Sequence, residues 1–279
     1  MFDPQSTRTP SDQAIPTQDR ARLYALLANA WRHPEKALVS ALIGREDRGL
    51  LPAPSDGFSE PVNASIQSLV DTCDRFRDCP GTEVLATLRA EHARWFGHAV
   101  RGSCPPYELE YGHSEIIQQT AELADLSGFY KAFGLDLQDS AFERGDHISV
   151  ECEFLSVLCA KQAWGLREGQ VELAETCLDA QRLFLRDHPA RWSPAFAHRV
   201  AMADPEGFYG RVAYLTSTFI EGECQAFGIS VGPQWLELRP ADLERDAAID
   251  CDIRGCGGAP TDQLVQIEFG SRSAAGHAT

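Results

Sequence analysis

Apolar residues recur along most of the chain at the spacing of one face of an α-helix. The first such stripe occupies positions i, i+3, i+4, i+7 and i+8 and consists of Leu23, Leu26, Leu27, Ala30 and Trp31. Similar stripes follow in residues 37–42, 62–73, 85–96 and 115–134. Because an α-helix turns once every 3.6 residues, this spacing gathers the apolar side chains on one face that can be buried. The pattern therefore predicts a series of amphipathic helices.

Proline and glycine mark where these helices end. Pro34 pushes His33 out of the helical region, and Gly134 and Gly228 stand where a chain commonly leaves a helix. Thr82 is expected to cap the helix that follows it. Further helices are expected over residues 146–164, 169–187, 189–203 and 206–227. Alternation of apolar and polar residues, which is typical of strands, is scarce, so we expect an all-α fold, a multi-helix bundle of roughly nine or more helices.

The ends of the chain differ from this helical part in composition. Residues 1–17 are polar and contain three prolines, so we expect them to form a flexible arm. Residues 18–247 are expected to form the helical domain, with a hinge near residues 135–145 between two helical halves. Residues 248–279 are small, polar and rich in glycine, and we expect them to form a flexible tail.

The charge of the chain narrows the class of partner. The chain has 41 acidic residues and 25 basic ones, which gives a formal net charge of -16. Nucleic acids and anionic membranes bind basic patches, so this balance favours a basic partner or serves solubility alone. No apolar run approaches the roughly 20 residues of a membrane-spanning helix, and the first 20 residues lack the apolar stretch of a secretory signal. The nine cysteines form no short disulfide framework, so we expect free thiols and a cytoplasmic location.

Motifs for a metal site are incomplete. A di-metal site in a helical bundle needs two Glu-x-x-His pairs, and only Glu110 and His113 have that spacing. His147 and Glu151 would share a helix face, but no third ligand follows at a recognisable spacing. The alternative that this leaves open is a helical metalloenzyme that uses His92, His113 and His147 with nearby carboxylates.

The sequence also lacks the cysteine spacings of a zinc or redox site and the motifs of nucleotide-binding and hydrolytic enzymes. Neither Cys73 with Cys79 nor Cys251 with Cys256 has the CxxC spacing of a zinc or redox site, and the role of the second pair stays open. The chain has no GxxxxGK[ST] phosphate-binding loop and no GxSxG nucleophile turn. We therefore expect no catalytic residues, no metal ligands and no cofactor, and hence no enzymatic activity.

The segment at residues 104–111 (CPPYELEY) is the most informative surface motif. Pro106 suits the first position of a helix, where the missing N–H has no cost. In such a helix Tyr107 and Tyr111 would lie on one face, with the intervening glutamates on adjacent faces. Aromatic rings stack on cations and carboxylates accept guanidinium groups, so the cluster suits a peptide that is both apolar and basic. The alternative is a helix start whose tyrosines pack internally.

A second motif, Asp146-His147, precedes the next apolar stripe. Asp146 is expected to be the N-cap of the helix that follows, which explains this residue without any ligand. His147 would lie just inside the helix, where the positive end of the helix dipole disfavours a cation. This position favours a specific partner for the His147 side chain.

Four blocks of the sequence together resemble a known family. In order they are WFGHAVRGSCPPYELEYG, ADLSGFYKAFGL, DHISVECEFLSVL and LFLRDHPARW. Their order and spacing resemble the TorD/DmsD/NarJ family of molybdoenzyme maturation chaperones over roughly residues 19–230. The first two blocks look most similar to chaperones of type II enzymes of the dimethyl sulfoxide reductase family.

This resemblance implies a TorD-like, all-helical chaperone that binds the apo catalytic subunit of a molybdopterin oxidoreductase. Many such chaperones recognise the twin-arginine signal peptide of that subunit, delay its export and favour insertion of the molybdenum cofactor. Neither nucleic acid nor stable membrane insertion is expected. By resemblance, the peptide-binding surface would consist of Trp95, Phe96, Tyr107, Glu108, Glu110, Tyr111, Asp146, His147 and Glu151.

Overall fold

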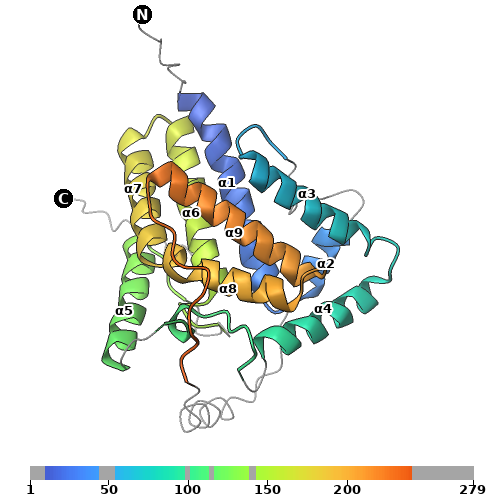
Figure 1. Cartoon of the computed structure of the whole chain (residues 1–279). Helices are drawn as coiled ribbons and strands as arrows, with labels where there is room; N and C mark the ends of the chain where they lie inside the picture. Colours follow the sequence, from blue (N-terminus) through green and yellow to red (C-terminus); the bar gives the residue numbers. More distant parts are fainter. Residues whose placement is uncertain (1–9, 44–53, 98–100, 113–115, 138–142, 241–279) are drawn as a thin grey trace, which may run out of the picture.

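The computed structural model describes residues 10–43, 54–97, 101–112, 116–137 and 143–240 (Figure 1). Within these ranges the chain forms nine α-helices and one 3-10 turn but no β-strand, which confirms the predicted all-α bundle. In chain order the elements are α1 (Pro10–Trp31), α2 (Lys36–Ile43), α3 (Glu60–Asp74), α4 (Gly81–Phe96), η1 (Glu108–Glu110), α5 (Ile116–Ala132), α6 (Ile148–Arg167), α7 (Val171–Asp187), α8 (Pro189–Ala203) and α9 (Phe208–Phe227). None of the described helices combines the length and the apolar character that crossing a bilayer requires.

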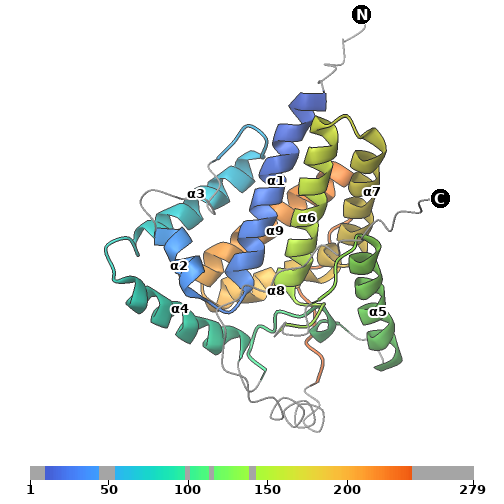
Figure 2. The ribbon, with the colours of Figure 1, turned by 180° about the vertical axis from the view of Figure 1, so that it is seen from behind.

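Helices α1 and α6 lie side by side at the centre of the bundle (Figures 1 and 2). Helix α7 packs beside α6, and α9 packs on α3 and α8. The indole of Trp31 is fully buried at the end of α1, and its Nε1 donates to Thr216 Oγ1 at 3.1 Å. Its aromatic neighbours are Phe96, Phe196 and Tyr209. Large rings of this kind supply much of the apolar area of a core.

The buried apolar side chains form one continuous core. Leu26 of α1 and Phe208 of α9 belong to the same cluster as Leu126 of α5 and Phe154 of α6. The cluster joins elements that precede and follow residues 135–145. The hinge expected near residues 135–145 stays a prediction, since residues 138–142 lie outside the described part of the chain.

Several helix ends follow the local signals in the sequence. Helix α8 has the predicted bounds, and α9 ends at Phe227, where Gly228 adopts a φ of 66°. The predicted cap of α4 is wrong, because the helix begins at Gly81 and Thr82 lies inside its first turn. Pro80 precedes the helix in an extended conformation, and its fixed φ lets the chain enter the helix without a side-chain cap.

Helix α1 begins earlier than the sequence indicated. Its first residue is Pro10, so the predicted arm of residues 1–17 is wrong from that residue onward, and residues 1–9 lie outside the described part. Proline is tolerated in the first turn of a helix because the missing N–H has no intrahelical partner there. Arg20 Nε donates to Glu223 Oε1 at 2.8 Å, which ties this part of the helix to α9.

After α9, residues 229–240 form no helix and run past α8 to the neighbourhood of η1 (Figure 1). We call these residues the C-terminal strap. The Gly232 amide donates to the Ala190 carbonyl at 2.8 Å, and Tyr111 forms an antiparallel bridge with Leu238. The predicted tail, with Cys251 and Cys256, lies outside the described residues.

Candidate peptide-binding site

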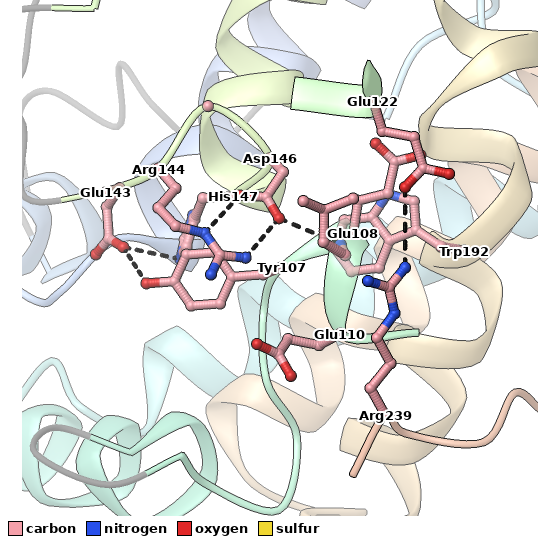
Figure 3. A network of polar contacts seen from close by, with 12 residues as sticks. Tyr107, Glu108, Glu110, Glu122, Glu143, Arg144, Asp146, His147, Trp192 and Arg239 are labelled. Atoms are coloured by element: carbon pink, nitrogen blue, oxygen red, sulfur yellow. Dashed lines mark hydrogen bonds and ion pairs between the residues drawn. The ribbon is translucent and has the colours of Figure 1, made fainter. Parts of the chain in front are cut away.

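The two motifs singled out in the sequence lie against each other (Figure 3). The Glu108 amide donates to the Asp146 carbonyl at 2.9 Å, and the Ile148 amide donates to the Pro106 carbonyl at 2.9 Å. An isolated antiparallel bridge joins the two segments at this point. The CPPYELEY segment is therefore attached to the start of α6 through its backbone.

The CPPYELEY segment does not form the helix expected from Pro106. Only η1 is helical, and Tyr107 and Tyr111 on its two sides are extended, with φ angles of −121° and −109°. The two rings consequently do not share a face. Tyr107 lies 4.9 Å from the ring of His147, whereas Tyr111 lies 5.3 Å from the ring of Trp192. The backbone bridges on both flanks of η1 hold the chain extended and override the helix-start signal of proline.

The capping roles of Asp146 and His147 differ from the prediction. His147 is the N-cap of α6, and its Nδ1 accepts the Ser149 amide at 3.1 Å. Asp146 instead binds the backbone of η1, because its Oδ2 accepts the Leu109 amide at 3.2 Å. Arg144 holds the same carboxylate through Nε at 2.9 Å and Nη2 at 2.7 Å. The long-range contact with η1 thus replaces the local cap.

His147 has a carboxylate neighbour within the protein. His147 Nε2 lies 3.6 Å from Glu143 Oε2, and the Tyr107 hydroxyl donates to the same oxygen at 2.6 Å. Burial lowers the pKa of His147, although Glu143 opposes this shift. Burial opposes ionisation of Glu143 in turn, but His147 and the Tyr107 hydroxyl hold the pKa of Glu143 below its usual range. No spacing signal in the sequence points to Glu143, which lies four residues before His147 in a non-helical loop.

A second buried cluster joins η1 to α6 and α8. Glu108 Oε2 lies 3.0 Å from His188 Nδ1, and Trp192 Nε1 donates to Glu151 Oε2 at 3.2 Å. Burial raises the pKa of Glu151 well above its usual value, and Glu108 adds to this effect. Burial also raises the pKa of Glu108, while its contact with His188 opposes the shift. His188 and Trp192 are not among the residues predicted from the sequence, although both lie in the LFLRDHPARW block.

A small open pocket of about 160 Å³ lies beside this cluster. It is lined by Glu108, Tyr111, Gly112, Glu122, Arg191, Trp192, Leu236 and Arg239. The side chains of Glu110 and Glu122 remain 23% and 28% exposed, so their carboxylates are reachable from solvent. The site therefore combines reachable carboxylates with aromatic walls, and the guanidinium groups of Arg191 and Arg239 also line the pocket.

Comparison with known proteins decides the family. The family model described as nitrate reductase delta subunit matches residues 55–198, just over half of the chain. The chain belongs to this family. Among curated proteins, the chaperone protein TorD of Vibrio cholerae serotype O1 (strain M66-2) is 26% identical over 74% of this chain and 91% of the relative.

Two relatives with shorter matches are named as assembly chaperones. The chlorate reductase assembly chaperone protein of Ideonella dechloratans is 38% identical over 28% of this chain and 39% of its own. The selenate reductase assembly chaperone protein of Thauera selenatis is 37% identical over 29% of this chain and 42% of its own. These names confirm the resemblance inferred from the four sequence blocks. The chain is accordingly a chaperone and not an enzyme.

The chaperone buries most of the residues expected to touch a peptide. Asp146, His147 and Glu151 are 0%, 1% and 0% exposed. In this conformation they present no surface to a ligand, so direct contact is open to the partly exposed Tyr107 and Glu110 instead. The buried residues hold the segment that carries these two side chains.

The remaining expected contact residues lie at the end of α4. Phe96 is buried in the core of the chaperone, while Trp95 is partly exposed beneath Arg94, whose guanidinium lies 4.4 Å from the indole ring. The Cys104 amide donates to the Trp95 carbonyl at 2.9 Å, and the Gly102 amide donates to the Phe96 carbonyl at 3.2 Å. The two aromatic residues therefore anchor the beginning of the CPPYELEY segment through their backbone.

The structure gives no support to the metalloenzyme alternative. Among the described residues, no group of three or more His, Cys, Asp and Glu side chains could hold a metal ion. The imidazole of His92 packs against Phe96 and Tyr209, and burial, assisted by nearby imidazoles, lowers the pKa of His92 to about 4. His113 lies outside the described residues.

Proposed function

We propose that this chain is a cytoplasmic, system-specific chaperone for the apo catalytic subunit of a type II molybdopterin oxidoreductase. It binds the twin-arginine leader of that subunit, assists insertion of the molybdenum cofactor and delays export until insertion is complete. The names of the chlorate and selenate reductase assembly chaperones support the class of client. The four sequence blocks support the leader as the recognised segment.

The observation that carries this proposal is the combination of carboxylates and aromatic rings around η1. Glu110 and Glu122 can accept guanidinium groups (Figure 3). The partly exposed ring of Tyr107, on which Arg144 already stacks at 4.6 Å, shows that this surface suits a cation. A leader with consecutive arginines and apolar residues matches both properties. The net charge of -16 speeds the encounter with a basic segment, and added salt reduces this advantage.

The buried residues take part by positioning the exposed ones. Asp146 fixes η1 through the Leu109 amide, and Glu108 is held by His188. Because η1 is a single turn, these contacts fix the backbone that carries Glu110, while Arg101 holds the Glu110 carboxylate at 2.6 Å. Binding thus depends on side chains that the peptide does not touch.

Calorimetry with a synthetic peptide that carries two consecutive arginines followed by leucines tests recognition. Loss of one charge-assisted contact in Glu110→Gln or Glu122→Gln should weaken binding about 10-fold. The exposed Glu172 on α7 provides the matched control, since Glu172→Gln removes the same charge far from η1. Equal affinities for all three variants and the unchanged chain would sink the assignment of the site.

A pull-down from cells that make molybdoenzymes tests the class of client. The tagged chain should recover a molybdopterin oxidoreductase subunit, and elemental analysis should find that subunit poor in molybdenum. Recovery of only mature, molybdenum-loaded enzyme would contradict a role before cofactor insertion.

A further inference from the structure

The C-terminal strap contacts the site in the way that an extended peptide would. The Arg239 amide donates to the Glu110 carbonyl at 3.0 Å, and the Gly112 amide donates to the Glu237 carbonyl at 2.9 Å. These two bonds flank the antiparallel bridge described above. Addition of an extended segment to a free backbone edge is a common mode of peptide recognition.

The side chains of the strap have the chemistry that the site suits. Leu236 and Leu238 pack partly buried against the core, and Arg239 comes directly after them. The guanidinium of Arg239 lines the pocket, where its Nη2 lies 3.8 Å from Glu122 Oε2 (Figure 3). Its Nε donates to the Gly112 carbonyl at 3.4 Å. The strap thus presents an apolar and basic segment to the surface proposed for the client leader.

The strap is held mainly through its backbone. Arg101 Nη1 donates to the Arg239 carbonyl at 2.8 Å, and Arg199 Nη2 donates to the Leu236 carbonyl at 3.0 Å. The Arg239 guanidinium lies 3.8 Å from Glu122 Oε2 and 3.4 Å from the Gly112 carbonyl, and Arg101 binds the neighbouring Glu110 at 2.6 Å. Burial lowers the pKa of Arg239 and outweighs the opposing effect of the surrounding carboxylates. None of residues 229–240 belongs to the buried core, so the strap is a surface segment whose departure uncovers only the core residues that Leu236 and Leu238 cover.

We propose that the strap is an internal competitor, which occupies the site in the client-free protein with Arg239 in the place of a client arginine. An arginine-containing client segment then binds by displacing the strap. This inference rests on the proposed function and explains how the site would discriminate between client segments. A segment binds only if its own contacts exceed those of the strap, so weakly basic segments are rejected.

Relief of competition can be measured as a gain in affinity. Fluorescence anisotropy would compare binding of the Arg-Arg peptide to the full chain, to Arg239→Ala and to Arg182→Ala. Arg182 is exposed on α7, so its substitution removes the same charge away from the site. We expect Arg239→Ala to bind the peptide about 10-fold more tightly and Arg182→Ala to match the unchanged chain. Leu238→Ala, which weakens the strap without changing its charge, should also tighten binding.

Hydrogen exchange of residues 234–240 would follow the strap directly. Saturating Arg-Arg peptide should speed exchange in this segment of the unchanged chain. Two results would overturn the proposal that the strap competes with the client and would leave the proposed function intact. One is unchanged hydrogen exchange when the peptide is bound, and the other is equal peptide affinity for Arg239→Ala and the unchanged chain. If the peptide bound to none of these proteins, the proposed recognition of arginine-containing leaders would be contradicted, and so would the proposal that the strap competes with them.

Discussion

The carboxylate of Asp146 accepts a hydrogen bond from the backbone amide of Leu109 at 3.2 Å, across 37 positions of the chain. The side chain of Asp146 is fully buried, and Arg144 compensates its charge through two hydrogen bonds. This one carboxylate therefore fixes η1 against the start of α6. Its removal should affect both the stability of the chaperone and the shape of the binding surface.

Asp146→Ala should lower the free energy of unfolding by about 2 to 4 kcal/mol, because the Leu109 amide and the Arg144 guanidinium lose their acceptor. Asp146→Asn retains an acceptor oxygen for Leu109 and should lose about half as much. Urea unfolding followed by circular dichroism measures both changes. The control is Asp179→Ala on the exposed face of α7, which should stay within about 0.5 kcal/mol of the unchanged chain. A loss for Asp146→Ala no larger than this would contradict the role of the contact.

His147→Ala should lower the free energy of unfolding by about 1 to 2 kcal/mol, because the Ser149 amide loses its cap. His147→Asn should recover most of this loss, since asparagine is a strong N-cap residue. Thermal unfolding of the two variants provides the measurement. If the His147→Asn variant melted no higher than the His147→Ala variant, the ring contacts of His147 with Tyr107 and Glu143 would matter more than the cap.

Glu151→Gln should change how stability depends on pH. Burial and Glu108 raise the pKa of Glu151, so the folded chain holds a proton that the unfolded chain has released above about pH 4.3. This contribution is fully present below the unfolded pKa and is lost as the pH rises through the folded pKa. Glutamine mimics the protonated side chain. Between the unfolded and the folded pKa of Glu151, the free energy of unfolding of the variant should therefore rise relative to that of the unchanged chain by up to about 1.4 kcal/mol per pH unit. Urea midpoints measured from about pH 4 to about pH 8 provide the test, and parallel curves for the two proteins would contradict the prediction.

Arg20→Ala should destabilise the chaperone by about 3 kcal/mol, because it leaves the buried Glu223 carboxylate without its charged partner. Arg22 lies two residues later on the same helix, and its side chain is 60% exposed beside Asp19. Arg22→Ala should therefore change the free energy of unfolding by less than about 0.5 kcal/mol. Guanidinium chloride unfolding compares the two. Equal losses would show that Arg20 does not tie α1 to α9.

The helices were predictable because their signals are local. The apolar stripe from Leu23 to Trp31 and the glycine at position 228 act within a few residues of the structure that they specify. The start of α1 could not be located from the sequence, because three prolines in a polar stretch favour a loose segment, although Pro10 is compatible with a first turn.

The conformation of the candidate site was not predictable in the same way. Its backbone is set by bridges from Tyr107 to His147 and from Tyr111 to Leu238, and no pattern within the CPPYELEY segment encodes them. The sequence did identify the two motifs that meet. It could not assign the capping roles, because the Asp146 carboxylate accepts a hydrogen bond from a distant amide of η1. His147 therefore caps α6 in its place.

The pairing of α1 with α6 has a consequence for the synthesis of the molecule. Arg32, just after α1, forms an ion pair with Glu153 of α6, 121 positions later. At about 5 to 20 residues per second, a ribosome needs roughly 6 to 24 seconds to make the intervening chain. Throughout that time the apolar face of α1 lacks its principal neighbour. Until α6 has been translated, this apolar face is therefore a surface on which a nascent chain can aggregate or be cleaved, in a protein whose relatives are named as assembly chaperones.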